Sequence, residues 1–204
     1  MVALVILLGV VLVIFLFLIF YQFIFLRDPL RSVPSSDSIV APADGKIISI
    51  VKVSSSKTKI NKGLIGKVNI LCSDVVKEGY LISIFMSVFN VHVNRAPLAG
   101  EILSIKHKKG NFFRAFDFEK SLLNESNEII MKTSIGKVKL IQIAGFIARR
   151  IECFVKENQK VNKGQKIGRI VMGSQVSLIL PISVKLIVKK GDKVRAGETI
   201  IAEK

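Results

Sequence analysis

The sequence lacks tryptophan and holds only two tyrosines, two histidines and two cysteines among its 204 residues. Proteins that bind single-stranded nucleic acids stack the bases on aromatic side chains placed beside basic ones. No such motif occurs here, so a nucleic-acid partner is disfavoured. Cys72 and Cys153 stand far apart, without the short spacings of a metal site. We therefore predict no metal and no disulfide, and two buried structural thiols in a reducing compartment.

Acidic residues are also scarce, since 15 Asp and Glu stand against 31 Lys and Arg, for a formal net charge of +16. An excess of this size indicates a polyanionic partner, either nucleic acid or an anionic membrane surface. With nucleic acid disfavoured, we predict the membrane surface. The basic residues that we assign to it are Lys106, Lys108, Lys109, Arg149 and Arg150.

The first 26 residues carry no charged side chain. Residues 2–26 are apolar except for Gly9, Tyr21 and Gln22, and a helix of this length extends about 37 Å, enough to cross a hydrocarbon core of about 30 Å. A cleaved signal peptide fits less well, because a basic start and a small-residue cleavage site are missing. Arg27 and Arg31 follow the run, so the positive-inside rule predicts a cell-membrane protein with its body on the cytoplasmic side.

The rest of the chain has the pattern of a mainly β protein. Prolines and serines in residues 27–38 predict a linker, and residues 39–204 form the predicted domain. Short β-branched runs separated by Gly-, Asn- and Lys-rich turns predict strands at 47–53, 67–72, 80–86, 101–106, 128–134, 137–144, 176–180 and 184–188. A short helix is predicted at 112–123.

An internal repeat supports a β-sandwich. Residues 155–167 recur as residues 188–200, with six of thirteen positions identical in the pattern V-K-x3-K-V-x2-G-x2-I. Short strand, polar turn and short strand at this spacing resemble the hairpins of biotinyl- and lipoyl-type barrel-sandwich domains. Two copies are too few for a solenoid. The fold class is therefore mainly β, with a sandwich or barrel-sandwich-like domain behind an N-terminal transmembrane helix.

Three short stretches could carry chemistry. Gly173-Ser174 precedes an apolar run that ends at Pro181, His92 follows a predicted strand, and Asp44 lies in Pro-Ala-Asp-Gly-Lys. Taken singly, each has a plain structural interpretation. Gly-Ser is a common turn pair, a histidine in an apolar context is more often structural, and Asp44 is a turn residue.

Together and in this order, these stretches resemble the phosphatidylserine decarboxylase proenzymes of the short, membrane-associated kind. The resemblance covers nearly the whole chain after the anchor. Its motifs are Phe-Leu-Arg-Asp-Pro at 25–29, Pro-Ala-Asp-Gly-Lys at 42–46, Asn-Val-His-Val-Asn-Arg-Ala-Pro at 90–97, Asn-Glu at 124–125, Gln-Ile-Ala-Gly at 142–145, Ala-Arg-Arg-Ile at 148–151 and Gly-Ser at 173–174.

The resemblance implies an enzyme that first cleaves itself between Gly173 and Ser174. The Ser174 hydroxyl would attack the Gly173 carbonyl to form an ester, and β-elimination with loss of ammonia would leave a pyruvoyl group at residue 174, the covalent cofactor. The products would be two associated chains, 1–173 and 174–204; a higher oligomer is left open. The pyruvoyl ketone would form a Schiff base with phosphatidylserine and accept electrons as carbon dioxide leaves, giving phosphatidylethanolamine.

The same resemblance assigns roles to three further residues. Asp44 supports a nearby base, and His92 is the best candidate for proton transfer. Arg95 stands where longer family members have a second histidine, so either His92 serves both steps or another group activates Ser174. Arg95 is instead a candidate to bind the substrate carboxylate or phosphate. His107 is assigned to a solvated basic patch.

Two questions stay open at the level of sequence. A diacyl phosphatidylserine and an ether-lipid analogue present the same amine and carboxylate, so the motifs do not separate them. A non-enzymatic adaptor, made of a membrane anchor and a lipoyl-like β domain, is the alternative function that the repeat supports.

Overall fold

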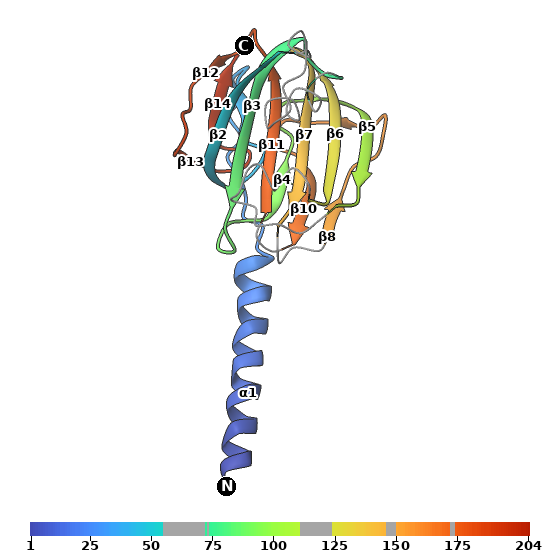
Figure 1. Cartoon of the computed structure of the whole chain (residues 1–204). Coiled ribbons are helices and arrows are strands. Elements are labelled where there is room, and N and C mark those ends of the chain that lie inside the picture. The colour runs from blue at the N-terminus through green and yellow to red at the C-terminus, as the bar shows by residue number, and fades with distance from the viewer. Residues whose placement is uncertain (55–71, 73, 111–123, 146–149, 172–173) are drawn as a thin grey trace.

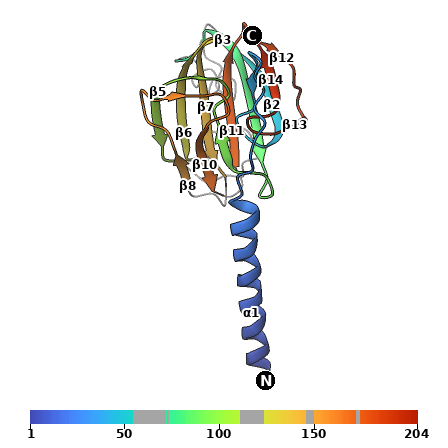
Figure 2. The same cartoon turned by 180° about the vertical axis from the view of Figure 1, so that it is seen from behind.

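The computed structural model describes residues 1–54, 72, 74–110, 124–145, 150–171 and 174–204. One N-terminal helix projects from a β-rich body, and the C-terminus lies at the far end of that body (Figure 1; Figure 2 gives the reverse side). The helix predicted at 112–123 and all but the last residue of the strand predicted at 67–72 lie outside the described residues. Cys72 itself is not in a strand.

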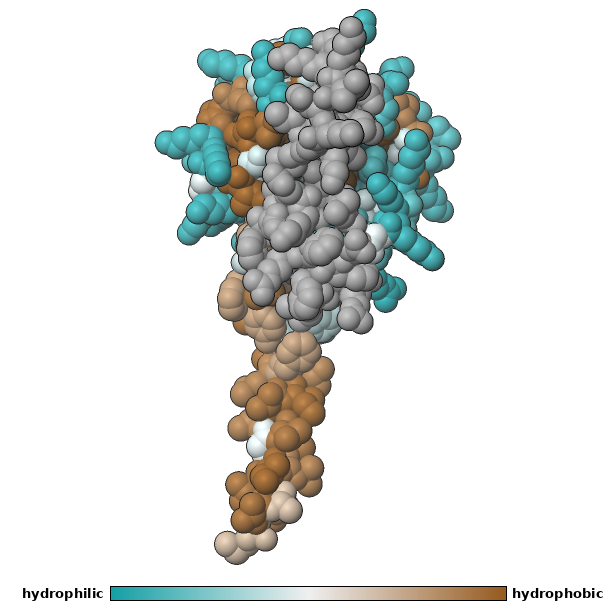
Figure 3. Space-filling view, viewed as in Figure 1, coloured by the Kyte–Doolittle hydropathy of each residue, from teal (hydrophilic) through white to brown (hydrophobic). Residues whose placement is uncertain are grey.

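The N-terminal helix has no aqueous face. α1 (Val2–Ile19) continues into the π-helical segment η1 (Phe20–Phe25), and the 24 residues have a mean hydropathy of 3.6. No side chain of α1 is buried against the body, and the visible surface of the helix is apolar (Figure 3). It is long and apolar enough to cross a membrane. The predicted anchor helix is therefore confirmed, and it indicates that the protein is membrane-associated.

Eight strands of the described chain form one large antiparallel sheet. They are β2 (Gly45–Ser54), β3 (Glu78–Met86), β5 (Gly100–Lys108), β6 (Ser126–Thr133), β7 (Gly136–Ala144), β9 (Lys160–Val161), β11 (Ser174–Pro181) and β13 (Lys193–Val194). Their spatial order is β13-β2-β3-β11-β7-β6-β5-β9. β11 therefore lies in the interior of the sheet, hydrogen-bonded to β3 on one side and β7 on the other.

Two small sheets complete the body. One contains β1 (Ile39–Val40), β12 (Lys185–Leu186) and β14 (Ile200–Glu203), in the order β1-β14-β12. The other contains β4 (Val93–Arg95), β8 (Arg150–Cys153) and β10 (Lys166–Val171), in the order β4-β10-β8. The main core joins Val176, Leu178 and Leu180 of β11 to Ile170 of β10 and Ile201 of β14. The expected mainly β, sandwich-like fold is confirmed.

Six predicted strands match β2, β3, β5, β6, β7 and β11 to within two residues at each end. The strand predicted at 184–188 is reduced to the two residues of β12. Both faces of the sheet are covered at β11, so its successive side chains are buried on either side and the strand is apolar throughout. Val176 and Leu178 face the main core, whereas Ile179 packs in a second buried cluster on the opposite face.

The hairpin interpretation of the internal repeat is wrong. β9 pairs with β5 and β10 pairs with β4 and β8, so the two strands of the first copy enter different sheets. In the second copy, β13 pairs with β2, and β14 pairs with β1 and β12. The repeat is nevertheless structural, because its two copies occupy equivalent places in the two halves of the body.

This duplication extends beyond the repeat. Val161 lies opposite Gly100 in one half, and Val194 lies opposite Gly45 in the other. These two glycines begin the matching stretches Gly-Lys-Ile-Ile-Ser-Ile and Gly-Glu-Ile-Leu-Ser-Ile. Strand order follows the same rule, since β9-β5-β6-β7 mirrors β13-β2-β3-β11. The two halves meet where β7 pairs with β11.

The cysteines differ in burial. Cys72 is buried in the second cluster, beside Leu81 and Ile179, and burial raises the pKa of its thiol to about 12. Cys153 is exposed, so the prediction of two buried thiols is wrong for this residue. It is the last residue of β8, which is an edge strand of its sheet. Both thiols are free.

Two glycines with positive φ but different surroundings give a test of the fold. Gly164 has φ 77°, donates its N–H to Ala96 at 2.8 Å, and leaves no room for a Cβ beside Val33. Gly136 also has a positive φ, 101°, but faces open space. Gly164→Ala is expected to cost about 2–3 kcal/mol of unfolding free energy, and the control Gly136→Ala about 1 kcal/mol. Equal losses in denaturant titrations would contradict the proposed close packing at Gly164.

Candidate active site

Ser174 is the first residue of β11, between Met86 on β3 and Ala144 on β7. It is 0% exposed, and alternation along the strand places its side chain on the core face with Val176. The hydroxyl donates to Sδ of Met86 at 3.5 Å. A thioether is a weak acceptor, so packing rather than a strong hydrogen bond holds this hydroxyl. Gly173, the residue before it, lies outside the described residues.

His92 lies at the same end of the large sheet, after the loop that leaves β3 at Met86. It is 0% exposed, and its Nδ1 is 2.9 Å from the backbone oxygen of Asn90. A carbonyl oxygen only accepts, so Nδ1 carries the proton and Nε2 presents a lone pair. Among the described residues, Nε2 has no hydrogen-bond partner. This nitrogen is therefore ready to accept a proton.

The surroundings of His92 keep it neutral. Burial lowers the pKa of His92 to about 4; the Asn90 carbonyl opposes this shift and the charge of Arg27 adds to it. Phe25, the last residue of η1, covers the imidazole, with the ring centroids 4.2 Å apart. An imidazole that stays neutral at physiological pH is a base, and here it is a base shielded from water.

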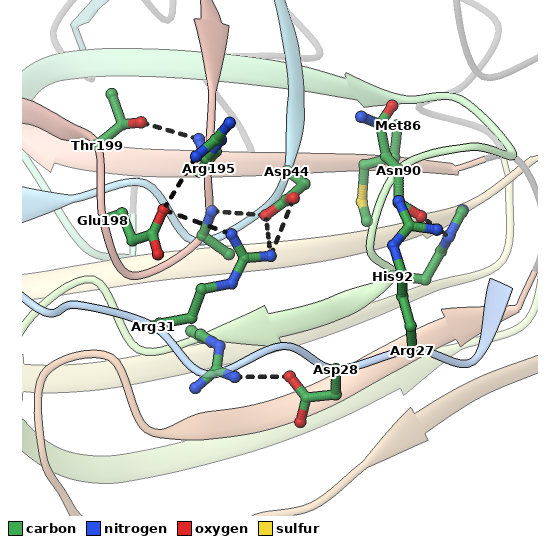
Figure 4. A network of polar contacts seen from close by, with 12 residues as sticks. Arg27, Asp28, Arg31, Asp44, Met86, Asn90, His92, Arg195, Glu198 and Thr199 are labelled. Carbon is green, nitrogen blue, oxygen red and sulfur yellow. Dashed lines mark hydrogen bonds and ion pairs between the residues drawn. The ribbon is translucent and has the colours of Figure 1, made fainter. Parts of the chain in front are cut away.

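Asp44 is not joined to His92. Both of its carboxylate oxygens lie 3.0 Å from Nη2 of Arg31, and Oδ1 accepts the backbone N–H of Ala196 at 2.7 Å. Arg31 also approaches Glu198, with 3.6 Å between Nη1 and Oε2. In Figure 4, dashed lines connect Asp44 within this cluster, and none runs from Asp44 to His92. The role of Asp44 in supporting a base stays a prediction.

Arg95 is buried and bound by the N-terminal segment. Its Nη2 lies 2.6 Å from Oδ1 of Asp28, and Nη1 donates to the Gly164 carbonyl at 2.9 Å. Asp28 also pairs with Lys166. Burial raises the pKa of Asp28, but the hydrogen bonds and charges of Lys166 and Arg95 outweigh it, so the net shift is downward. A contact of Arg95 with substrate stays a prediction.

Residues 25–31, which we call the junction segment, contact each of these three residues. Phe25 packs on His92, Asp28 binds Arg95, and Arg31 binds Asp44. Prolines and serines predict a linker at 27–38, and these residues form no helix or strand. Their buried contacts could not be predicted from composition or spacing. The motif Phe-Leu-Arg-Asp-Pro at 25–29 was the one indication that the segment belongs to the site.

An open cleft of about 580 Å³ lies next to Asp44 at the same end of the sheet. Its lining residues are Asp44, Gly45, Lys46, Phe85, Ser87, Asn90, Lys193, Val194, Arg195 and Thr199. Lys46 and Lys193 lie directly opposite each other on β2 and β13 and are exposed. The cleft therefore presents positive charge close to the histidine loop.

The predicted basic surface also falls at this end. Lys108 lies opposite Ser126, and Ser126 lies opposite Ile143, one residue before the end of β7. The end of β5 is thus on the side of the body from which the helix projects (Figure 1). His107 in this stretch is about half exposed and lies 3.1 Å from Glu125. Arg149 lies outside the described residues.

No cluster of histidine, cysteine or acidic residues able to hold a metal occurs in the described part of the chain. The thioether of Met86 contacts both the hydroxyl of Ser174 and the amide of Asn94, and the neutral imidazole of His92 lies at the same end of the sheet. They can move a proton and hold a polar carbonyl group.

Comparison with known proteins identifies the relatives of this chain. The family model described as phosphatidylserine decarboxylase matches residues 18–202. The phosphatidylserine decarboxylase proenzyme of Desulfotalea psychrophila is 42% identical over 192 residues, which cover 93% of this chain and 82% of that protein. A Methanocaldococcus jannaschii protein, provisionally named archaetidylserine decarboxylase proenzyme, is 40% identical over 190 residues, covering 92% and 91%.

The burial of His92 predicts a specific pH dependence of stability. The pKa of His92 is about 4 in the folded protein, against an ordinary value of 6.5 that applies to the unfolded chain. As the pH falls, His92 is therefore protonated in the unfolded chain before it is protonated in the folded one. Stability present above pH 6.5 is lost as the pH falls toward 4, by about 1.4 kcal/mol per pH unit and about 3 kcal/mol in all. Thermal melts recorded from pH 7 to 4 measure this loss. The decrease in stability with falling pH should be smaller in His92→Gln than in wild type, and unchanged in His107→Gln. Equal slopes in wild type and His92→Gln would contradict this account.

The Arg31–Asp44 pair predicts that the junction segment stabilises the body. Arg31→Met leaves the Asp44 carboxylate buried without its cation, and we expect a loss of about 3 kcal/mol of unfolding free energy. The matched control is Lys204→Met, which breaks the pair with Asp37, an aspartate whose side chain is 90% exposed; it should cost less than about 1 kcal/mol. Denaturant titrations measure both. Equal losses of unfolding free energy in the two variants would show that Arg31 does not form the buried ion pair with Asp44.

Proposed function

The chain belongs to the phosphatidylserine decarboxylase family, and we propose that it is a proenzyme that cleaves itself before Ser174 and then converts phosphatidylserine to phosphatidylethanolamine at a membrane surface. The family is pyruvoyl-dependent, and residue 174 is where this chain would carry that group. The relatives are named as proenzymes, in keeping with an inactive precursor that matures by cleavage.

The observation that carries the proposal is the environment of Ser174. The hydroxyl of Ser174 is fully buried, and among the described residues its one hydrogen-bond partner is the thioether of Met86. At the same end of the sheet lies His92, which is buried and neutral and whose Nε2 has no hydrogen-bond partner among the described residues. A serine hydroxyl is a weak nucleophile until a base removes its proton. A neutral imidazole is suited to that task at physiological pH, and His92 is our candidate for it.

The proposed cleavage balances with water alone as co-reactant. Oγ of Ser174 adds to the Gly173 carbonyl carbon, and the peptide C–N bond breaks as the ester forms. A base then removes the α-proton of residue 174, and its Cβ–Oγ bond breaks to leave Gly173 as a carboxylate. The dehydroalanine at residue 174 tautomerises to an imine, and water hydrolyses it to a ketone and ammonia.

The pyruvoyl group, once formed, supplies a ketone that captures the substrate amine and accepts the electron pair as carbon dioxide leaves. The residues present fit such a group. Position 174 is fully buried beside a thioether and an amide, so water is excluded and polar donors are at hand. The protein part of the work is to bind the head group and to return a proton to the product, for which His92 is again the candidate.

The strand pairing supports two chains that stay together after cleavage. β11 is hydrogen-bonded along its length to β3 and β7, and β14 pairs with β1. Since β13 also pairs with β2, chain 174–204 would thus remain part of four strand pairs with chain 1–173. Cleavage in front of β11 removes one peptide bond and no pairing within the sheets.

The cleft and the anchor support a lipid substrate. Lys46, Lys193 and Arg195 line the cleft near Asn90, and cations of this kind bind a phosphate diester. The helix projects from the same end of the body (Figure 1), so this end would face the membrane. Relatives named for diacyl and for archaeal lipids match equally well, so we propose the shared serine head group as the recognised part. Arg27 and Arg31 favour the cytoplasmic side.

Intact-mass measurement tests the proposal directly. Wild-type protein should yield a fragment 174–204 lighter by one ammonia than the peptide that begins with serine, and should release carbon dioxide from phosphatidylserine vesicles. Ser174→Ala should remain at full length and be inactive, because no oxygen nucleophile remains at residue 174. The control is Ser177→Ala, which removes another buried hydroxyl from the same strand; it should still cleave. Cleavage of Ser174→Ala, or a wild-type chain that never cleaves, would overturn the assignment.

A further inference from the structure

A chain of buried amides leads from the far side of the sheet to Ser174. Nδ2 of Asn127 donates to Oε1 of Gln142 at 2.9 Å, and Nε2 of Gln142 donates to Oδ1 of Asn94 at 2.8 Å. Nδ2 of Asn94 then points at Sδ of Met86, 3.7 Å away. The same sulfur accepts the Ser174 hydroxyl at 3.5 Å. These five side chains are at most 2% exposed.

The direction of the chain is determined by its last member. An amide oxygen turned toward a thioether would face another electron-rich atom, whereas an amide N–H finds a weak acceptor there. With Nδ2 of Asn94 facing Met86, its Oδ1 must accept from Gln142, and Oε1 of Gln142 must accept from Asn127. The amides of the network therefore fix one another's orientation.

The backbone makes space for this arrangement. Gly168 on β10 lies opposite Asn94 on β4. A Cβ at residue 168 would come within 2.6 Å of Nε2 of Gln142. The glycine thus allows an amide from the large sheet to reach an amide of the small sheet across the core. An apolar pair would fill this space more simply, and fully buried polar side chains are uncommon unless they bind something.

The end of the chain is under-satisfied. Two donors, the amide of Asn94 and the hydroxyl of Ser174, converge on one thioether, which is a weak acceptor for either. A buried N–H with a poor acceptor keeps much of its desolvation cost. A carbonyl or hydroxyl oxygen at residue 174 would be a better partner for this donor than the sulfur. Nδ2 of Asn94 and Oγ of Ser174 lie 3.7 and 3.5 Å from the same sulfur atom, so a small movement of the Met86 side chain would let the two groups meet.

We propose that the side-chain amide of Asn94 is the hydrogen-bond donor to the oxygen on residue 174, to the hydroxyl oxygen before cleavage and to the keto oxygen afterwards. The inference rests on the proposed function. Donation to the hydroxyl oxygen directs its proton away from Asn94, so that a base can take it. Donation to the keto oxygen stabilises the negative charge that develops when an amine adds. Gln142 and Asn127 are positioning residues that hold the Asn94 amide in this orientation.

The test is the rate of self-cleavage in a pulse of cell-free synthesis, followed by intact mass of fragment 174–204. Asn94→Leu keeps the size and removes the donor. It should slow cleavage about 100-fold, because the donor stabilises the negative charge that develops on Oγ of Ser174 as a base removes its proton. Gln142→Leu leaves the donor but frees its orientation, and should slow cleavage on the order of tenfold. Asn127→Leu should have a smaller effect of the same kind.

Ser83→Ala is the matched control, because it removes a buried polar group of the same sheet that pairs with Ser177 at 2.9 Å and lies outside the amide network; it should cleave within a few-fold of wild type. Met86→Leu conserves volume and removes the sulfur, so it separates packing against the sulfur from hydrogen bonding by Asn94. If Met86→Leu is as slow as Asn94→Leu, packing against the sulfur governs Ser174 and the assignment of Asn94 is overturned. Normal cleavage of Asn94→Leu overturns it as well. A wild type that does not cleave would instead refute the proposed function.

A second measurement separates a donor from a structural residue. In matured protein labelled with ¹³C-serine, the infrared band of the ketone at residue 174 should move to higher wavenumber in Asn94→Leu, with kcat lowered and KM unchanged. An unmoved band would overturn the proposal. Should Asn94→Leu fail to give the circular dichroism spectrum of the folded protein, Asn94→Asp, which keeps the shape and replaces the donor by an oxygen, takes its place with the same expected results.

Discussion

The pairing of β11 between β3 and β7 is the interaction on which the rest of the structure depends. It places Ser174 at a fixed point, fully buried and next to Met86. It also gives residues 174–181 hydrogen bonds on both edges, so that the strand needs no covalent link to the residue before it. If the chain is cut before Ser174 as proposed, the hydrogen bonds of β11 to its two neighbouring strands would hold the new chain end in place, so the site would stay rigid without that peptide bond.

The two similar halves of the body make the departures from symmetry informative. At the equivalent turns, Asp44 stands in one half where Ala99 stands in the other, and Arg95 stands where the first half has Val40. Both departures are buried charges, which are costly unless they are paired. Each is paired with the junction segment, Asp44 with Arg31 and Arg95 with Asp28. The N-terminal segment is thus bound where the duplicated fold ceases to be symmetric.

Much of the fold could be predicted from the sequence because it depends on local pattern. The uncharged helix and six long strands have hydrophobic patterns that short-range rules recognise. The repeat at 155–167 and 188–200 was visible in the sequence, but its place in two similar halves became visible only in the strand pairing. The two-residue strands β9 and β13 could not be predicted, since each exists only through a partner some 60 to 150 residues away. The same holds for the contact of Arg31 with Asp44, and for Cys153, whose exposure depends on a sheet margin. Family motifs predicted Ser174, His92 and Asp44, but not that Asp44 faces Arg31.

The position of Phe25 connects the anchor to the chemistry. Its ring belongs to the last turn of the apolar helix and yet is 0% exposed, packed on the imidazole of His92. Burial is what lowers the pKa of His92 to about 4, so part of the cover that keeps this base neutral is supplied by the segment that enters the membrane. An enzyme whose substrate lies in a bilayer must keep water from its reacting groups while remaining open to lipid. Phe25 meets the first condition, because its ring covers the imidazole at the point where the apolar helix ends; the residues of α1 before it are apolar and exposed, as contact with lipid requires.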